Sequence, residues 1–153
     1  MPNWCEGTLK IRGAKENMLN FIKNGLEPSN GDNIQIEKEH DTYDGHEIES
    51  VYVHINGEPY VNGTRRAFIN SCDAYAFEDN DVMIFDVMQA WGFNIDEWLE
   101  IAKEYHIDIR LYGFEQGMEF NQEIEILNGK PTINRIIHFN DYRWECIEPN
   151  FGG

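Results

Sequence analysis

The side chains best suited to bind a metal ion gather in the middle of the chain. Three histidines are interspersed there with three carboxylates: His40, His46, His54, Glu39, Asp44 and Glu47. Imidazole nitrogens and carboxylate oxygens are common zinc ligands. The histidine intervals of six and eight residues match no standard zinc motif, so exposed loop histidines are the simpler interpretation. A metal-dependent hydrolase that uses this block is the alternative.

A second stretch, Asp79-Asn80-Asp81, begins like a calcium-binding loop. Such a loop requires glycine at its sixth position and a bidentate glutamate at its twelfth. Ile84 and Ala90 stand at those positions. We therefore predict a turn before a strand and no metal site.

Motifs for covalent catalysis or nucleotide binding are missing. No serine lies in a GxSxG pattern, and no Walker or GxGxxG sequence occurs. Cys72 precedes Asp73, but a lone buried cysteine is a simpler interpretation than a nucleophile. Cys5, Cys72 and Cys146 are too scattered for a disulfide framework or an iron–sulfur cluster. The sequence predicts a non-enzymatic protein without a cofactor.

The net charge is the clearest compositional feature. The chain has 28 Asp and Glu against 12 Lys and Arg, which gives a net charge of -16. Such a protein repels nucleic acids and anionic membranes at long range. One acidic block, from Glu37 to Glu49, is offset only by Lys38. A second extends through residues 67–102, which contain no lysine or arginine.

The second block supplies our predicted partner-binding residues. They belong to an acidic turn and to the outer face of a helix: Glu78, Asp79, Asp81, Asp96, Glu97, Glu100 and Glu104. The simpler alternative is that these carboxylates are solvated and keep the protein soluble.

Hydrophobic periodicity predicts the elements that carry these residues. Thr8–Arg12 alternates as a strand, and Ala14–Asn24 has the pattern of a helix that ends at a left-handed Gly25. An inserted hairpin is expected over 34–56. Val82–Met88 is apolar almost throughout, which predicts a central strand of the sheet.

A second helix is the clearest expected element. Asn94 and Glu97 have the spacing of a capping box. Apolar residues then recur at helical intervals: Ile95, Trp98, Leu99, Ala102 and Tyr105. A strand over Ile107–Tyr112 follows, and an appended hairpin is expected over 119–139 because Asn128-Gly129 suits a type I′ turn.

These elements together predict a single domain spanning residues 1–153. The order strand, helix, strand, strand, helix, strand is that of the split βαβ arrangement. The expected fold class is α+β: a ferredoxin-like sandwich, with an antiparallel sheet, two helices and appended β-hairpins.

Three segments carry a resemblance to a known family. They are Met1-Pro2-Asn3-Trp4-Cys5-Glu6 with the strand ending at Gly13, Met83–Trp91, and Tyr112–Phe120. The chain resembles the YubB-type ferredoxin-like proteins of phages and conjugative plasmids. It departs from their pattern at Asn70–Ala74 and Gly92-Phe93. The resemblance implies a ferredoxin-like fold and an origin on a mobile element, but no activity.

Charge and resemblance lead to one functional expectation. We expect a small acidic phage or plasmid protein that inhibits a host nucleic-acid-handling defence enzyme, of the anti-CRISPR or anti-restriction type. A carboxylate-rich surface would occupy the partner's basic nucleic-acid-binding groove as a mimic of DNA. Alternatives are the hydrolase and a regulatory module that dimerises through its sheet.

Other partners are disfavoured by the sequence. The aromatic candidates for RNA stacking, Phe85 and Tyr112, lie on strands with Asp86 and Asp108, so direct nucleic-acid binding is not expected. No apolar run is long enough for a membrane span, and the start lacks the pattern of a signal peptide. The expected location is the host cytoplasm.

Overall fold

The computed structural model describes residues 1–153 and contains eleven strands in two sheets. The eight-stranded sheet has the order β11-β10-β9-β1-β8-β6-β5-β2, and the three-stranded sheet has the order β3-β4-β7. The large sheet consists of β1 Trp4–Arg12, β2 Leu26–Glu27, β5 Tyr60–Val61, β6 Ala67–Ile69, β8 Val82–Ala90, β9 Asp108–Glu115, β10 Phe120–Leu127 and β11 Lys130–His138. The small sheet consists of β3 Asn33–Tyr43, β4 His46–Asn56 and β7 Cys72–Ala76.

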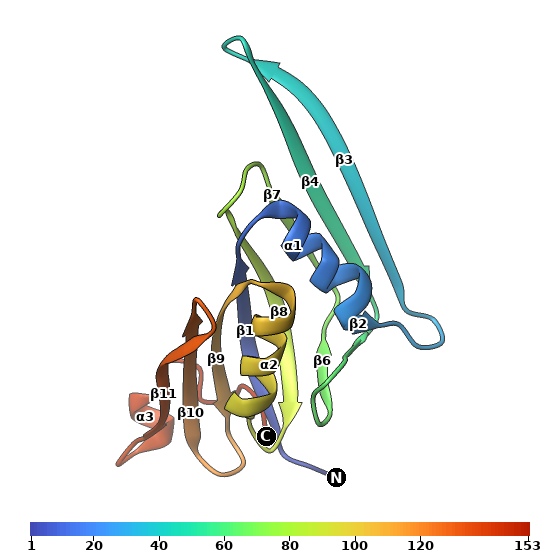
Figure 1. The fold of residues 1–153 in the computed structure, drawn as a ribbon. Helices are drawn as coiled ribbons and strands as arrows, with labels where there is room; N and C mark the ends of the chain where they lie inside the picture. Colours follow the sequence, from blue (N-terminus) through green and yellow to red (C-terminus); the bar gives the residue numbers. More distant parts are fainter.

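The helices are short, and the two longer ones cover one face of the sheets. They are α1 Lys15–Asn20, continued by the π-helical turn η1 Phe21–Gly25, then α2 Ile95–Tyr105 and α3 Tyr142–Glu145. In Figure 1, α1 and α2 both lie in front of the strands. Strand β1 alternates accordingly: Leu9 and Ile11 are fully buried in the core with Trp98 of α2, whereas Lys10 and Arg12 are exposed.

The ferredoxin-like fold class expected from the sequence is wrong, because the protein is mostly β. Additional strands extend the sheet on both sides of β9-β1-β8-β6, and a separate second sheet forms. The additional strands β2 and β5 could not be predicted from the sequence, because they have two residues each, too few for an alternating pattern. The hairpin expected over 119–139 also forms a continuous ladder with β9 and is not a mere appendage.

The β3–β4 hairpin extends far beyond the rest of the molecule (Figure 1). Its strands pair from Asn33 with Asn56 to Tyr43 with His46, and this ladder contains the hairpin expected over 34–56. Strand β7 pairs only with Val51–Ile55 of β4. The distal part of the hairpin is therefore a two-stranded ribbon without a third strand.

Of the two helix ends predicted from the sequence, one is confirmed and one is wrong. The Asn94 side chain accepts from the N–H groups of Asp96, at 3.0 Å, and Glu97, at 3.4 Å, which confirms the predicted N-cap. The left-handed cap predicted at Gly25 is wrong, because Gly25 has no positive φ. A Cβ there would lie 2.7 Å from the Phe21 ring, so close packing is what requires glycine. No helix is long and apolar enough to cross a membrane.

Candidate functional site

The acidic turn between β7 and β8 uses two of its three carboxylates internally. Asp79 accepts from the backbone N–H of Lys15, at 2.9 Å, where α1 begins. Asp81 accepts from the N–H groups of Phe77, at 2.8 Å, and Glu78, at 3.0 Å. These bonds fix the turn against the body of the protein. Of the three acidic residues expected here as partner contacts, only Glu78 has no such role.

Glu97 of α2 also has an internal role. Both of its oxygens accept from the Arg65 N–H at 3.1 Å, and one accepts from Gln89 Nε2 at 2.9 Å. The buried Gln89 in turn accepts from the Trp98 indole N–H at 2.9 Å. Glu97 therefore does not complete a capping box, because its carboxylate accepts from the Arg65 N–H, 32 residues away, and from the Gln89 side chain. The remaining expected contacts on this helix are exposed: Asp96, Glu100 and Glu104.

The distal part of the β3–β4 hairpin differs from the acidic turn and from Glu97, because most of its carboxylates are exposed. We call residues 37–49 the acidic arm; its residues 37–47 are all exposed. It carries six carboxylates and one lysine: Glu37, Glu39, Asp41, Asp44, Glu47, Glu49 and Lys38. Alternate residues of a strand share a face, so Glu37, Glu39 and Asp41 form one row spaced about 6.8 Å apart. Lys38 lies on the other face, 3.7 Å from Glu49.

Exposed aromatic side chains continue the face that bears this carboxylate row. Tyr52 on β4 is the cross-strand partner of both Glu37 and Tyr75. The ring centroids of Tyr52 and Tyr75 are 6.3 Å apart, and those of Tyr75 and Phe77 are 5.2 Å apart. Tyr75 is 56% exposed and Phe77 is 45% exposed. Aromatic residues are enriched in protein interfaces, so this row is a candidate contact surface.

A hollow of about 300 Å³ joins the aromatic row to the large sheet. Its apolar lining includes Tyr75, Phe77, Val82 and Ile84, which we call the apolar patch, and Asp73 and Asp81 stand at its margin. Val82 is 43% exposed and Ile84 is 50% exposed. The strand predicted over Val82–Met88 is central in the large sheet, between β1 and β6, yet these two side chains are exposed. Their apolar character was the sequence signal for an exposed apolar surface.

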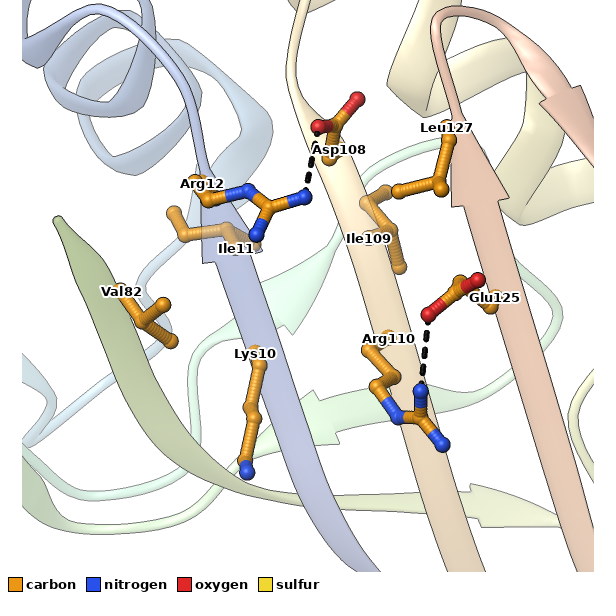
Figure 2. A pocket seen from close by; sticks show the side chains of 9 residues that line it. All are labelled: Lys10, Ile11, Arg12, Val82, Asp108, Ile109, Arg110, Glu125 and Leu127. Atoms are coloured by element: carbon orange, nitrogen blue, oxygen red, sulfur yellow. Dashed lines mark hydrogen bonds and ion pairs between the residues drawn. The ribbon is translucent and has the colours of Figure 1, made fainter. Parts of the chain in front are cut away.

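On its other side, Val82 borders a pocket of about 80 Å³ on the open face of the large sheet (Figure 2). Arg12 pairs with Asp108 at 3.3 Å, and Arg110 pairs with Glu125 at 2.7 Å. Only Lys10 of the three cations in the pocket has no carboxylate partner. Because the arginine donors are occupied by neighbouring carboxylates, the pocket does not present a free phosphate clamp.

The aromatic pair considered for RNA stacking does not form a platform. Phe85 is 1% exposed and belongs to the core, whereas the other residue of the pair, Tyr112, is half-buried. The Phe85 ring is therefore closed to a stacked base.

The three histidines of the middle block are not brought together. His54 lies opposite Gln35, five residues along β3 from His40, which corresponds to about 17 Å. The hydrogen bond that His54 Nδ1 donates to Asp73, at 2.9 Å, and the nearby Glu37 raise the pKa of His54. His40 instead lies 3.3 Å from Glu49. No group of three or more His, Cys, Asp or Glu side chains is placed to hold a metal ion.

The cysteines lack the properties of a nucleophile. All three are free, and Cys5 and Cys146 are buried. Burial raises the pKa of Cys5 to about 12 and also raises the pKa of Cys72, the residue considered for catalysis. The reactive thiolate is therefore scarce at neutral pH at both positions.

Comparisons of the chain with protein-family models, with curated proteins and with solved structures found no match. The resemblance to the YubB-type proteins stays a prediction from the sequence.

Proposed function

We propose that this protein binds and inhibits a host nucleic-acid-handling enzyme by placing its acidic arm in the enzyme's basic groove. The observation that carries the proposal is the junction of two surfaces: the row Glu37, Glu39 and Asp41 continues into the exposed aromatic and apolar side chains around Tyr75. Charge alone keeps a protein soluble, but an exposed apolar patch beside it favours association with a partner.

The two surfaces would contribute differently to binding. Carboxylates at an interface rim raise the association rate and select a positively charged partner. Burial of aromatic anchors in a partner's pocket supplies most of the affinity, roughly 1.5–3 kcal/mol for each large apolar side chain. Tyr75 and Phe77 are the proposed anchors, and the arm provides the electrostatic attraction.

The contacts expected from the sequence divide under this proposal. Glu78, Asp96, Glu100 and Glu104 remain candidate contacts, because each is exposed. Three others are already engaged within the chain: Asp79, Asp81 and Glu97. The target class, a restriction or CRISPR enzyme, rests on the resemblance to mobile-element proteins.

Affinity capture from host lysate tests the proposal. The bait is used as wild type, as Y75S/F77S, and as the control W144S/I147S, whose two residues are each 86% exposed on the C-terminal segment. We expect wild type and control to retain one partner that Y75S/F77S loses, with retention falling as salt rises.

The captured partner is then tested for nucleic-acid binding. We expect duplex DNA or RNA to compete with this protein for it. Equal capture by Y75S/F77S, or a partner that binds no nucleic acid, would contradict the proposal.

A further inference from the structure

Arg65 and Arg66 are adjacent in the sequence, and neither has a carboxylate partner, unlike three of the other arginines of this chain. Arg65 and Arg66 are exposed and precede β6. Neither guanidinium takes part in an ion pair. By contrast, Arg12, Arg110 and Arg135 each lie between 2.6 and 3.3 Å from a carboxylate oxygen. Other cations of the chain also lack a carboxylate partner, but Arg65 and Arg66 are adjacent in sequence and share an aromatic ring.

Both guanidinium groups stack on the same indole. Arg65 Cζ is 5.2 Å from the centroid of Trp91, and Arg66 Cζ is 5.8 Å from it. Arg66 Cζ is also 5.5 Å from the ring of Trp4. Each exposed cation–π contact contributes about 0.5–1 kcal/mol, but the two like charges around one ring repel each other. An anion between them would remove that repulsion.

The backbone holds this cluster in place. Trp91 has φ of 62°, a left-handed conformation that is unfavourable for a bulky side chain. Its N–H donates to the Asn3 carbonyl at 2.7 Å, and its side chain remains 52% exposed. A strained backbone of this kind persists where the surrounding contacts hold it in place, and such residues concentrate at functional sites.

Arg65 is fixed from both sides of its peptide backbone. Its N–H donates to Glu97 at 3.1 Å, and its carbonyl accepts from Gln89 Nε2 at 3.1 Å. Glu97 is thus engaged with the backbone of Arg65 and forms no ion pair with its guanidinium. The backbone of Arg65 is therefore held in one position, and its guanidinium is free to pair with an anion.

We propose that Arg65 and Arg66, stacked on Trp91 and Trp4, bind the phosphate group of a small phosphorylated ligand. Stacking covers the faces of a guanidinium and leaves its N–H edges free for in-plane hydrogen bonds. A phosphate dianion matches two positive charges, and its terminal oxygens accept from two N–H forks, whereas one carboxylate satisfies a single fork. The net charge of -16 repels long polyanions, which favours a small ligand over a nucleic acid.

This site is separate from the acidic arm. Trp91 follows directly after β8, whose C-terminal end lies at the opposite end of the molecule from the tip of the β3–β4 hairpin (Figure 1). Loss of partner binding through the arm and loss of phosphate binding here are therefore distinguishable by variants at the two ends.

Calorimetric titration at low ionic strength tests the phosphate site. The probes are inorganic phosphate, a nucleoside monophosphate, the unphosphorylated nucleoside and a single-stranded oligonucleotide. The variants are R65Q/R66Q and the control K130Q/R143Q, which removes two exposed, unpaired cations elsewhere. Circular dichroism verifies that both variants are folded.

We expect one of the phosphate probes to bind wild type and the control equally, and R65Q/R66Q at least tenfold more weakly. Trp fluorescence should change with phosphate in wild type and not in R65Q/R66Q. The nucleoside without phosphate should not bind. Equal binding by R65Q/R66Q, no binding of either phosphate probe to wild type, or binding of the oligonucleotide alone would overturn the proposal.

Discussion

The two acidic regions of this protein use their carboxylates in different ways. In the body, Asp79, Asp81 and Glu97 accept hydrogen bonds from backbone N–H groups and fix a turn and a loop. In the acidic arm, the row Glu37, Glu39 and Asp41 is exposed, and its Glu39 and Asp41 lie on the two-stranded part of the hairpin. Both regions are rich in carboxylates, so the charge count does not show which region is free to contact a partner. What distinguishes the two regions is whether backbone N–H groups without another partner lie close enough to hydrogen-bond the carboxylates.

Removal of Glu97 should give the largest change in stability. Glu97→Ala leaves the Arg65 N–H without its acceptor and removes one of the two acceptors of the buried Gln89 Nε2, so we expect the free energy of unfolding to fall by about 2 kcal/mol. Glu100→Ala, one turn along on the exposed face, should change it by less than about 0.5 kcal/mol. Urea denaturation measures both. Equal effects would mean that Glu97 is as free as Glu100.

Asp81 should come next. Asp81→Ala removes the acceptor for the N–H groups of Phe77 and Glu78, and we expect a loss of about 1–1.5 kcal/mol. Its matched control is Glu78→Ala in the same turn, with an expected effect within about 0.5 kcal/mol. The prediction fails in denaturant melts if the two variants unfold at the same urea concentration.

Shortening the arm should affect stability less than either of those substitutions. Residues 41–48 are replaced by Asn-Gly, which joins the cross-strand pair His40 and Glu49 through a two-residue turn. The free energy of unfolding should change by less than about 1 kcal/mol, because the removed ribbon has no third strand. A loss above about 2 kcal/mol by the same measurement would show that the arm helps to hold the body together.

The smallest effect concerns His54 beside the arm. The hydrogen bond that it donates to the Asp73 carboxylate raises the pKa of His54 above the ordinary 6.5, so protonation stabilises the folded state. That contribution is complete below pH 6.5 and is lost as the pH rises through the folded-state pKa. Asp73→Asn should lower the pKa of His54 in an NMR titration. An unchanged pKa would exclude Asp73 as its cause.

Local sequence signals were sufficient where the partners lie close in the chain. The cap at Asn94 was predicted correctly, and so was the turn at Asn128-Gly129, whose residues have φ of 51° and 71°. Leu127 and Lys130 pair across that turn as expected for a two-residue hairpin loop. These features depend on residues only two or three positions apart.

Features that depend on distant residues could not be predicted. Glu97 follows its cap with the right spacing, yet Arg65 and Gln89 come from other strands and loops and attract its side chain. The two-residue strands that extend the large sheet carry no periodic pattern of their own, and so the fold class was predicted wrongly. The exposure of Val82 and Ile84 likewise depends on what packs above β8.

We propose that the arm contributes more to partner binding than the outer face of α2. The direct test is the dissociation constant of the captured partner for E37Q/E39Q/D41N and for D96N/E100Q/E104Q, which each remove three negative charges. We predict at least about tenfold weaker binding for the arm variant, with a reduced salt dependence, and near wild-type binding for the helix variant. Equal weakening by both variants, or stronger weakening by the helix variant, would contradict this claim.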